Sequence, residues 1–168
     1  AAGAVDCWGL GMSGQTAVPE GLGDVVELDA GGDTTCARRA DGTVTCWGDP
    51  DDDAQDVPED LRAADQIAVA ASHACALDVA GAITCWGGAG VTGTIEVPAD
   101  LDRIVRIAVS PLHGCALDVA GAVTCWGEDP DGRATVPGDL APAVAIAVGG
   151  GHTCALDAEG VVTCWGAN

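Results

Sequence analysis

Residues 152–168 read HTCALDAEGVVTCWGAN, and this stretch decides the fold because its pattern occurs four times along the chain. Earlier copies read TTCARRADGTVTCWG at 34–48, HACALDVAGAITCWG at 73–87 and HGCALDVAGAVTCWG at 113–127. In each copy a Gly separates two short apolar segments, and Gly can adopt the left-handed conformation that closes a three-residue hairpin loop. We therefore predict four β-hairpins, closed at Gly42, Gly81, Gly121 and Gly160.

A CWG triplet sets the period of the repeat. Its five Trp residues are spaced by 39, 39, 40 and 39 positions, and a VP dipeptide keeps the same phase. We interpret residues 1–168 as one domain, with a partial repeat at 1–22, full repeats at 23–61, 62–101 and 102–140, and a partial repeat at 141–168. The Trp residues are Trp8, Trp47, Trp86, Trp126 and Trp165.

Other segments of each repeat also have the pattern of strands. VVELDA (25–30), IAVA (67–70), VRIAVS (105–110) and VAIAV (144–148) are rich in β-branched residues and lie next to Gly, Ser or Pro. The segment before each VP can supply a short fourth strand, because Pro is tolerated at a sheet edge. Four short antiparallel strands in each repeat, without a covering helix, are typical of propeller blades. We predict an all-β fold, a β-propeller of about four blades with a Trp between neighbouring blades.

The two ends of the chain each carry part of a repeat. The C-terminal part has the first three strands of a unit, and the N-terminal part has a third and a fourth. We expect one blade to be built from both chain ends, which would close a ring and remove exposed sheet edges. The alternative is that the ends of neighbouring molecules pair head to tail, which gives a larger ring or a fibre.

Composition restricts the partners and the compartment. The formal net charge of −20, from 26 acidic residues against six basic ones, repels phosphate backbones and anionic lipids. We therefore expect no nucleic-acid partner, and no membrane insertion because no apolar run reaches about 18 residues. Nine Cys residues favour an oxidising, extracellular or cell-surface location. The first residues lack the pattern of an intact signal peptide, so a secreted protein would be a processed form.

The repeat resembles a known family. GGGHTCALDAEGVVTCWG (149–166), together with WGLGMSGQTAVPEGL (8–22), resembles the RCC1-like repeat of the regulator-of-chromosome-condensation superfamily in its bacterial secreted form. A β-lactamase inhibitor protein also belongs to that superfamily. The resemblance implies a β-propeller, and it implies little about function because the family includes nucleotide exchange factors, inhibitors and surface proteins. Two departures are the small number of repeats and the absence of a basic, chromatin-facing surface.

Each hairpin carries two Cys residues in a C-x9-C spacing. Counting inward to the three-residue loop places them opposite each other on adjacent strands, where Cα atoms ~4.5 to 5.5 Å apart fall within disulfide range. The alternative is that they are small buried thiols. Cys7 has no partner hairpin, so we expect an unpaired thiol there. The predicted disulfides are Cys36–Cys46, Cys75–Cys85, Cys115–Cys125 and Cys154–Cys164.

Three His residues lie two positions before the first Cys of their hairpins, at His73, His113 and His152. An H-x-C arrangement can indicate zinc or copper, but no paired metal-ligand spacing accompanies it. A Cys-His nucleophile would rarely be present in several copies. The family resemblance implies that these His residues are structural, like the Trp residues, so we expect no catalytic residue, no metal and no cofactor.

The loops after the Trp residues differ between repeats, and variable loops on a repeated scaffold are where such proteins place recognition. Their carboxylates could provide oxygen ligands for Ca²⁺. A solvated acidic loop is the alternative that we prefer, because neither loop has the spacing of a complete calcium loop. The candidate ligands are Asp49, Asp51, Asp52 and Asp53 in one loop and Glu128, Asp129 and Asp131 in another.

The sequence therefore predicts a non-enzymatic, secreted or surface-exposed module that binds a protein partner through these loops. One alternative is a structural subunit that assembles with copies of itself through its terminal blades. Another is an inhibitor of a secreted enzyme, which rests on the family resemblance alone. The sequence names no particular ligand.

Overall fold

The computed structural model describes residues 3–88 and 96–167. These residues form four antiparallel sheets of three strands each, with one short 3-10 helix, η1 (Asp53–Gln55). The first sheet is β1 (Val25–Gly31), β2 (Thr34–Arg39) and β3 (Val44–Gly48), and the second is β4 (Ala64–Val69), β5 (His73–Asp78) and β6 (Ile83–Gly87). The third is β7 (Ile104–Val109), β8 (His113–Asp118) and β9 (Val123–Gly127), and the fourth is β10 (Ala143–Val148), β11 (His152–Asp157) and β12 (Val162–Gly166).

The second and third strands of each sheet form the hairpin that the sequence predicts. In the first sheet, Gly42 has a φ of 85°, the left-handed conformation that the turn requires. Asp41 precedes it, and its carboxylate accepts hydrogen bonds from the backbone N–H and the hydroxyl of Thr43. These bonds fix the turn, and they place Cys36 directly opposite Cys46.

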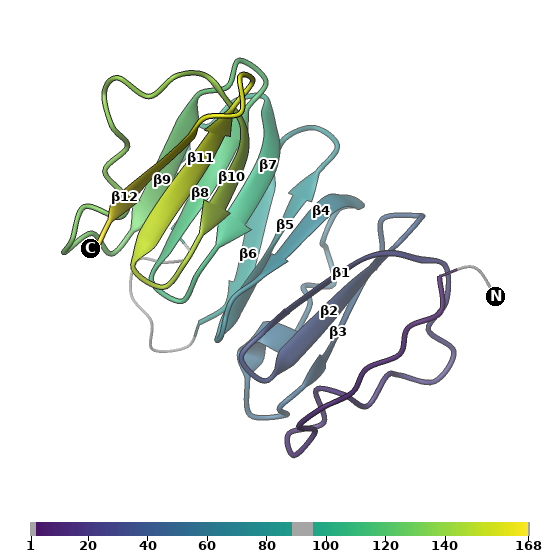
Figure 1. The fold of residues 1–168 in the computed structure, drawn as a ribbon. Helices are drawn as coiled ribbons and strands as arrows, with labels where there is room; N and C mark the ends of the chain where they lie inside the picture. The colour runs from purple at the N-terminus through teal and green to yellow at the C-terminus, as the bar shows by residue number, and fades with distance from the viewer. Residues whose placement is uncertain (1–2, 89–95, 168) are drawn as a thin grey trace.

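The four sheets stack in chain order, and the two termini lie at opposite ends of the stack (Figure 1). β1 and β2 contact β4, β5 contacts β7, and β8 contacts β10. The architecture is therefore four blades of a β-propeller that form an open stack rather than a closed ring. Within the described part of the chain, no helix is long and apolar enough to cross a membrane.

The core lies between the faces of successive sheets. Ile67 and Trp86 of the second sheet pack against Cys36 of the first, and Ile107 and Trp126 of the third pack against the second. A three-stranded sheet is apolar on both faces here, so it can be covered only by a neighbour on each side. Stacking is what buries this apolar surface.

Each buried Trp also reaches the loop of the preceding repeat. The indole N–H of Trp86 donates to the carbonyl of Ala54 at 2.9 Å, and that of Trp47 donates to the carbonyl of Gln15 at 3.0 Å. The side chains of Trp47, Trp86 and Trp126 are each 6% exposed. By contrast, Trp8 is 86% exposed and fills no gap between sheets.

The expected fourth strand does not form in the part of the chain that the structure describes, and the segment before Pro98, for which the same strand was expected, lies largely outside the described residues. The segments around Pro19, Pro58 and Pro137 are turns, in which the carbonyl of each Pro accepts a bond from the N–H of a Leu three residues later. Their backbone groups are satisfied locally, and Pro has no N–H to donate to a sheet ladder. Each sheet therefore has three strands among the described residues, where the sequence led us to expect four.

The expected blade built from both chain ends is also wrong. The described N-terminal residues form no strand and lie against the first sheet: the carbonyl of Gly3 accepts from the N–H of Val25, and that of Gln15 accepts from Trp47. Among the described elements, the fourth sheet packs on the third. Each segment packs on the sheet that is next in the chain, so the two ends remain apart.

The Trp contacts predict unequal losses of stability. Trp86→Ala removes a buried aromatic and its bond to the Ala54 carbonyl, so the free energy of unfolding should fall by about 3 to 5 kcal/mol in a urea titration. Trp8→Ala is the matched control and should change it by less than about 0.5 kcal/mol. Similar small losses for both variants would contradict a core role for Trp86.

Candidate functional site

The three His residues occupy one position of the repeat but have different surroundings. His73 and His113 are fully buried, each covered by the next sheet in the stack. His152 is exposed, because the described structure has no sheet beyond the fourth. Thr34 takes the same position in the first sheet, and its hydroxyl donates to Asp52. The position is therefore one at which a buried polar side chain faces the neighbouring sheet.

A hydrogen-bonded chain links the third and fourth sheets at His113. Its Nε2 lies 2.7 Å from the hydroxyl of Thr153, and its Nδ1 lies 2.9 Å from the hydroxyl of Ser110. The Thr153 hydroxyl donates onward to the carbonyl of Arg133. A His that is held between two hydroxyls and fully buried is a structural connection, with no access for a substrate.

Burial lowers the pKa of His113, and the nearby Arg133 guanidinium lowers it further, so the ring is neutral at physiological pH. Burial also lowers the pKa of His73. The ring nitrogens of His73 have no hydrogen-bond partner among the described residues. His113 faces Thr153 of the fourth sheet, whereas the equivalent residue of the third sheet, which faces His73, is Gly114 and has no hydroxyl. The Trp126 ring leaves no room for a side chain at Gly114.

Each of the four Cys pairs forms a disulfide in the structure. The Cα atoms within a pair are 4.0 or 4.1 Å apart, somewhat closer than the spacing that we expected. Cys36, Cys75 and Cys115 are fully buried between sheets. Cys7 is the free cysteine of the chain and is partly buried. The disulfides tie β2 to β3 and the equivalent strands of the other sheets, so they stiffen each hairpin that carries a loop.

The acidic loop at 48–56 is held by its own carboxylates. Asp52 caps η1 by accepting from the N–H of Ala54, and it also accepts from the hydroxyl of Thr34. Asp49 accepts from the N–H of Asp51, and its carbonyl accepts from the Gln55 side chain. Two of the four candidate calcium ligands in this loop therefore serve to fix the loop conformation.

The loop at 127–135 is fixed in a similar way. Asp129 accepts from the N–H of Ala134 and from the hydroxyl of Thr135, and the Thr135 bond lowers the pKa of this carboxyl. The side chain of Arg133 is buried, and it donates to Asp131 at 2.7 Å and to the carbonyl of Gly150 at 3.0 Å. The loop therefore carries an internal ion pair as well as its caps.

Some loop carboxylates have no such role. Four exposed loop residues have carboxylates without hydrogen-bond partners among the described residues: Asp51, Asp53, Asp56 and Glu128. Within that part of the chain, no three His, Cys, Asp or Glu side chains come together as a metal-binding group. We call the loops 9–17, 48–56 and 127–135 the loop surface. The equivalent loop after Trp86 lies largely outside the described residues.

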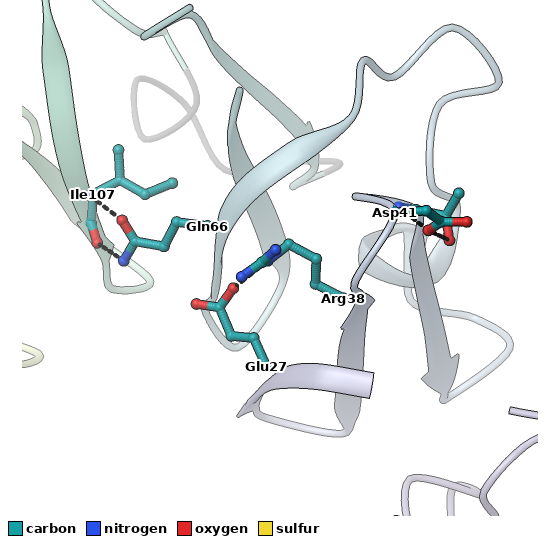
Figure 2. Close-up of polar contacts among 6 residues, drawn as sticks. Glu27, Arg38, Asp41, Gln66 and Ile107 are labelled. Carbon is teal, nitrogen blue, oxygen red and sulfur yellow. Dashed lines mark hydrogen bonds and ion pairs between the residues drawn. The ribbon is translucent and has the colours of Figure 1, made fainter. Parts of the chain in front are cut away.

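A second set of polar residues lies on the innermost strands, β1, β4, β7 and β10. The amide of Gln66 exchanges two hydrogen bonds with the backbone of Ile107 in the next sheet, at 2.8 and 2.9 Å (Figure 2). Asp29 accepts from the N–H of Val69 in the same manner. These side chains satisfy backbone groups at the free edge of the following sheet.

The innermost strands also line a hollow of about 440 Å³. Glu27 lies there, but it pairs with Arg38 at 2.7 Å (Figure 2), and Gln66 and Asp29 are used as described. The hollow therefore has few free polar groups with which to bind a ligand. Sequence analysis did not single out Gln66 or Asp29, although Asp29 is a polar departure from a position that holds Ala68, Ala108 and Ala147 in the equivalent strands.

The described structure provides no obvious reaction centre. The buried His113 contacts only hydroxyl and backbone groups, and eight of the nine Cys residues are in disulfides. What remains accessible is a rigid set of loops with different sequences and free carboxylates. Such a surface can bind another molecule by shape and charge.

Comparison with protein-family models identifies the repeat. Residues 25–54 and 143–168 match the model described as the Regulator of chromosome condensation (RCC1) repeat. A search of curated protein sequences finds no match. Two segments of the chain are therefore similar to the RCC1 repeat, and the four sheets have the fold of blades in an RCC1-like β-propeller.

Solved structures support the same fold. The CRINKLY WD40 ectodomain of the Arabidopsis thaliana receptor kinase ACR4 matches with a TM-score of 0.71 and 21% identity, over 84% of this chain and 50% of that one. Prp20p from Saccharomyces cerevisiae, in a study of its binding to Gsp1p and histones, matches with a TM-score of 0.70 and 18% identity, over 84% and 45%. Human WBSCR16 matches with a TM-score of 0.68 and 18% identity, over 89% and 49%.

The chain thus spans about half the length of the structures that it matches or less. At these identities the similarity establishes the fold alone. The expected relationship to a β-lactamase inhibitor protein stays a prediction.

The buried His residues predict a loss of stability on mild acidification. In the unfolded chain a His binds a proton near its usual pKa of 6.5, whereas burial holds the pKa of His113 below that value in the folded protein. The free energy of unfolding should therefore fall as the pH is lowered from about 7.5 to about 5.5, by up to about 1 kcal/mol for each buried His. Urea titrations at several pH values measure this fall.

Two substitutions test the assignment of this pH dependence. His113→Gln should remove part of the slope, and Val79→Gln, at an exposed position that does not titrate, should leave it unchanged. General repulsion among the carboxylates changes equally in all three proteins and cancels from the comparison. An unchanged slope in His113→Gln would contradict the role of burial.

The hairpin disulfides predict a specific peptide map. Mass spectrometry of unreduced peptides should find Cys36 linked to Cys46, the same pairing in the other three hairpins, and a free thiol at Cys7. Each short loop should contribute about 2 to 3 kcal/mol to stability, so reduction should lower the urea midpoint. Alkylation of all nine Cys residues without reductant would contradict the assignment.

Proposed function

We propose that this protein is a non-enzymatic protein-binding module, with the loop surface as its contact surface. The main support is the contrast within each repeat. The sheets are rigid and nearly identical, with a disulfide in every hairpin, whereas the loops after the Trp residues differ in sequence and are fixed by their own hydrogen bonds. Fixed loops lose little conformational freedom on binding, which favours affinity.

The charge of the loop surface favours a basic partner. Asp51, Asp53, Asp56 and Glu128 carry carboxylates that are not used inside the protein, and the whole chain has a net charge of −20. A cationic protein surface would be attracted over a distance and would then pair with these groups. Nucleic acid would be repelled by the same field. Binding of histones is stated for Prp20p, and a basic partner is consistent with that precedent.

We propose an extracellular or cell-surface location. Four disulfides need an oxidising compartment in order to persist, and two of the similar structures are receptor-kinase ectodomains. Inhibition of a secreted enzyme is a special case of protein binding. No contact in the described structure favours it over other partners.

Neutralising the free loop carboxylates tests the proposal. The variant Asp51→Asn, Asp53→Asn, Asp56→Asn, Glu128→Gln should lose most of the proteins that the unmodified chain captures from an extracellular fraction. The salt dependence of the remaining binding should also be weaker. The change leaves the capping residues Asp49, Asp52 and Asp129 in place, so the loops should keep their conformation.

The matched control removes the same number of charges outside the loop surface. Asp60→Asn, Asp65→Asn, Asp102→Asn, Glu159→Gln changes four exposed residues and should retain the captured proteins. Equal losses in both variants would show that net charge, rather than the loop surface, governs binding. Full capture by the loop variant would remove the support for this surface.

A further inference from the structure

The outer edge of the first sheet follows from the pairing of its hairpin. β3 is the last strand of that sheet, and its other edge is bonded to β2. The backbone N–H of Arg39 donates to the carbonyl of Thr43, and bonded and non-bonded pairs alternate from there along an antiparallel hairpin. Cys36 and Cys46 are therefore a non-bonded pair, which agrees with the short distance of 4.0 Å between their Cα atoms.

The backbone groups of Val44 and Cys46 consequently point away from β2. Among the described residues, neither of the two takes part in a backbone hydrogen bond outside the sheet. Both residues are only half-buried. An open edge of this kind can pair with an extended segment of another chain. Such a segment would take the place of the fourth strand that the sequence led us to expect.

An apolar pocket lies beside this edge. Its volume is about 220 Å³, and its apolar walls are formed by Val44, Val57, Pro58 and Leu61. Each of these four residues is half-buried, so the pocket is open to solvent. One branched aliphatic side chain fits such a space, and its burial would add to the affinity that backbone bonds provide.

The edge and the pocket fit a single ligand. The side chains of Val44 and Cys46 point toward the second sheet, because both pack against the core cluster that contains Trp86. A residue that pairs with Val44 from an added antiparallel strand has its side chain on the same face. That side chain would enter the pocket while the backbone of the same residue bonds to Val44.

The next repeat differs at the same place. β6 has an equivalent outer edge, but Ile83 replaces Val44, and Arg103 replaces Ala63, which also lines the pocket. Larger side chains leave less space beside the edge. We therefore expect the combination of an open edge and a pocket at β3 rather than at β6.

The charge around the pocket favours basic residues in the ligand. Glu59 follows Pro58 of the pocket wall and is exposed. Arg62, on another side of the pocket, is already paired with Asp78 at 3.5 Å. The whole chain has a net charge of −20. Basic residues on either side of the apolar one are therefore attracted, and acidic ones are repelled.

We propose that the outer edge of β3 binds an extended, basic peptide segment of a partner protein by antiparallel strand addition. The segment forms backbone hydrogen bonds with Val44 and Cys46, and it places one branched aliphatic side chain in the pocket. This site lies outside the loop surface and does not depend on the function proposed for that surface.

A synthetic peptide, acetyl-KTTITTK-amide, is the probe. Thr and Ile favour an extended backbone, the Ile suits the pocket, and the terminal Lys residues supply the charge. A fluorescent form should bind the full chain in anisotropy titrations, with one peptide per chain. Replacement of the Ile by Ala should weaken binding about tenfold, because the pocket is then left empty. Absence of binding up to about 1 mM peptide, or equal binding of the Ala peptide, would overturn the proposal.

Methylation of single peptide amides tests the strand pairing. The N–H groups of an added strand alternate between facing β3 and facing solvent. N-methylation of the Ile, whose amide faces Val44 in the proposed pairing, should weaken binding by about tenfold or more. N-methylation of either neighbouring Thr should have little effect. Equal effects at all three positions would contradict strand addition.

Two Pro substitutions test the site on the protein. Val44→Pro removes an N–H that faces outward, so the sheet keeps its own bonds, and peptide binding should weaken by about tenfold or more. Ile83→Pro is the matched control at the equivalent position of β6 and should retain binding. Equal binding by both variants would overturn the assignment to β3. Circular dichroism checks the fold, and if Val44→Pro does not fold, the methylated peptides on the unmodified chain decide.

The loop variant separates this site from the loop surface. Asp51→Asn, Asp53→Asn, Asp56→Asn, Glu128→Gln leaves the edge of β3 intact. It should bind the peptide within about twofold of the unmodified chain, at a salt concentration that screens long-range attraction. Loss of peptide binding in this variant would place the peptide on the loop surface and would contradict the strand addition. Retained peptide binding supports it, whatever proteins the loop surface captures.

Discussion

The hydrogen bond from a Trp indole to the loop carbonyl of the preceding repeat is the interaction on which the arrangement depends. Trp47 makes it to Gln15, and Trp86 makes it to Ala54, in each case 32 residues earlier. The Trp86 ring fills the space between the first and second sheets, while its N–H fixes the loop that connects them. Packing and loop geometry are therefore set by one side chain. This coupling explains why a repeat with short, three-stranded sheets can hold loops of different sequence in defined positions.

Cross-links within a sheet and contacts between sheets have different roles. Each disulfide joins two strands of one hairpin, so it stabilises a sheet without fixing its neighbour. The contacts between sheets come from apolar faces, from the indole bonds and from side chains such as Gln66 that cap the backbone of the next sheet. Disulfides therefore make each blade rigid, and burial of apolar faces holds successive blades together. Where the described structure has no neighbouring sheet, on the outer face of the fourth sheet, an apolar side chain such as Val162 is exposed.

The polar contacts differ from one interface between sheets to the next, although the stack is otherwise regular. His113 finds Thr153, whereas the buried ring nitrogens of His73 lack a partner among the described residues because the next sheet has Gly114 in place of Thr. A buried polar group without a partner lowers stability, and a satisfied one specifies which sheet fits which. The loop carboxylates also fall into two groups. Some accept hydrogen bonds from the backbone and fix the loop, and others have no partner within the protein and can pair with another molecule.

The sequence by itself determined the hairpins, the Cys pairs and the period, because each depends on residues that are close in the chain. Turn Gly residues, alternating apolar positions and a C-x9-C spacing act locally, and they repeat without loss. The sequence did not determine how the ends lie or that the VP segments are turns, because both depend on which backbone groups find partners after the sheets have stacked. The links of Gln66 to Ile107 and of His113 to Thr153 span 41 and 40 residues, so only the tertiary structure brings them together. It also decided which copies of one motif are buried: Trp86 and Trp8 share a sequence context, and only Trp86 has a sheet on either side.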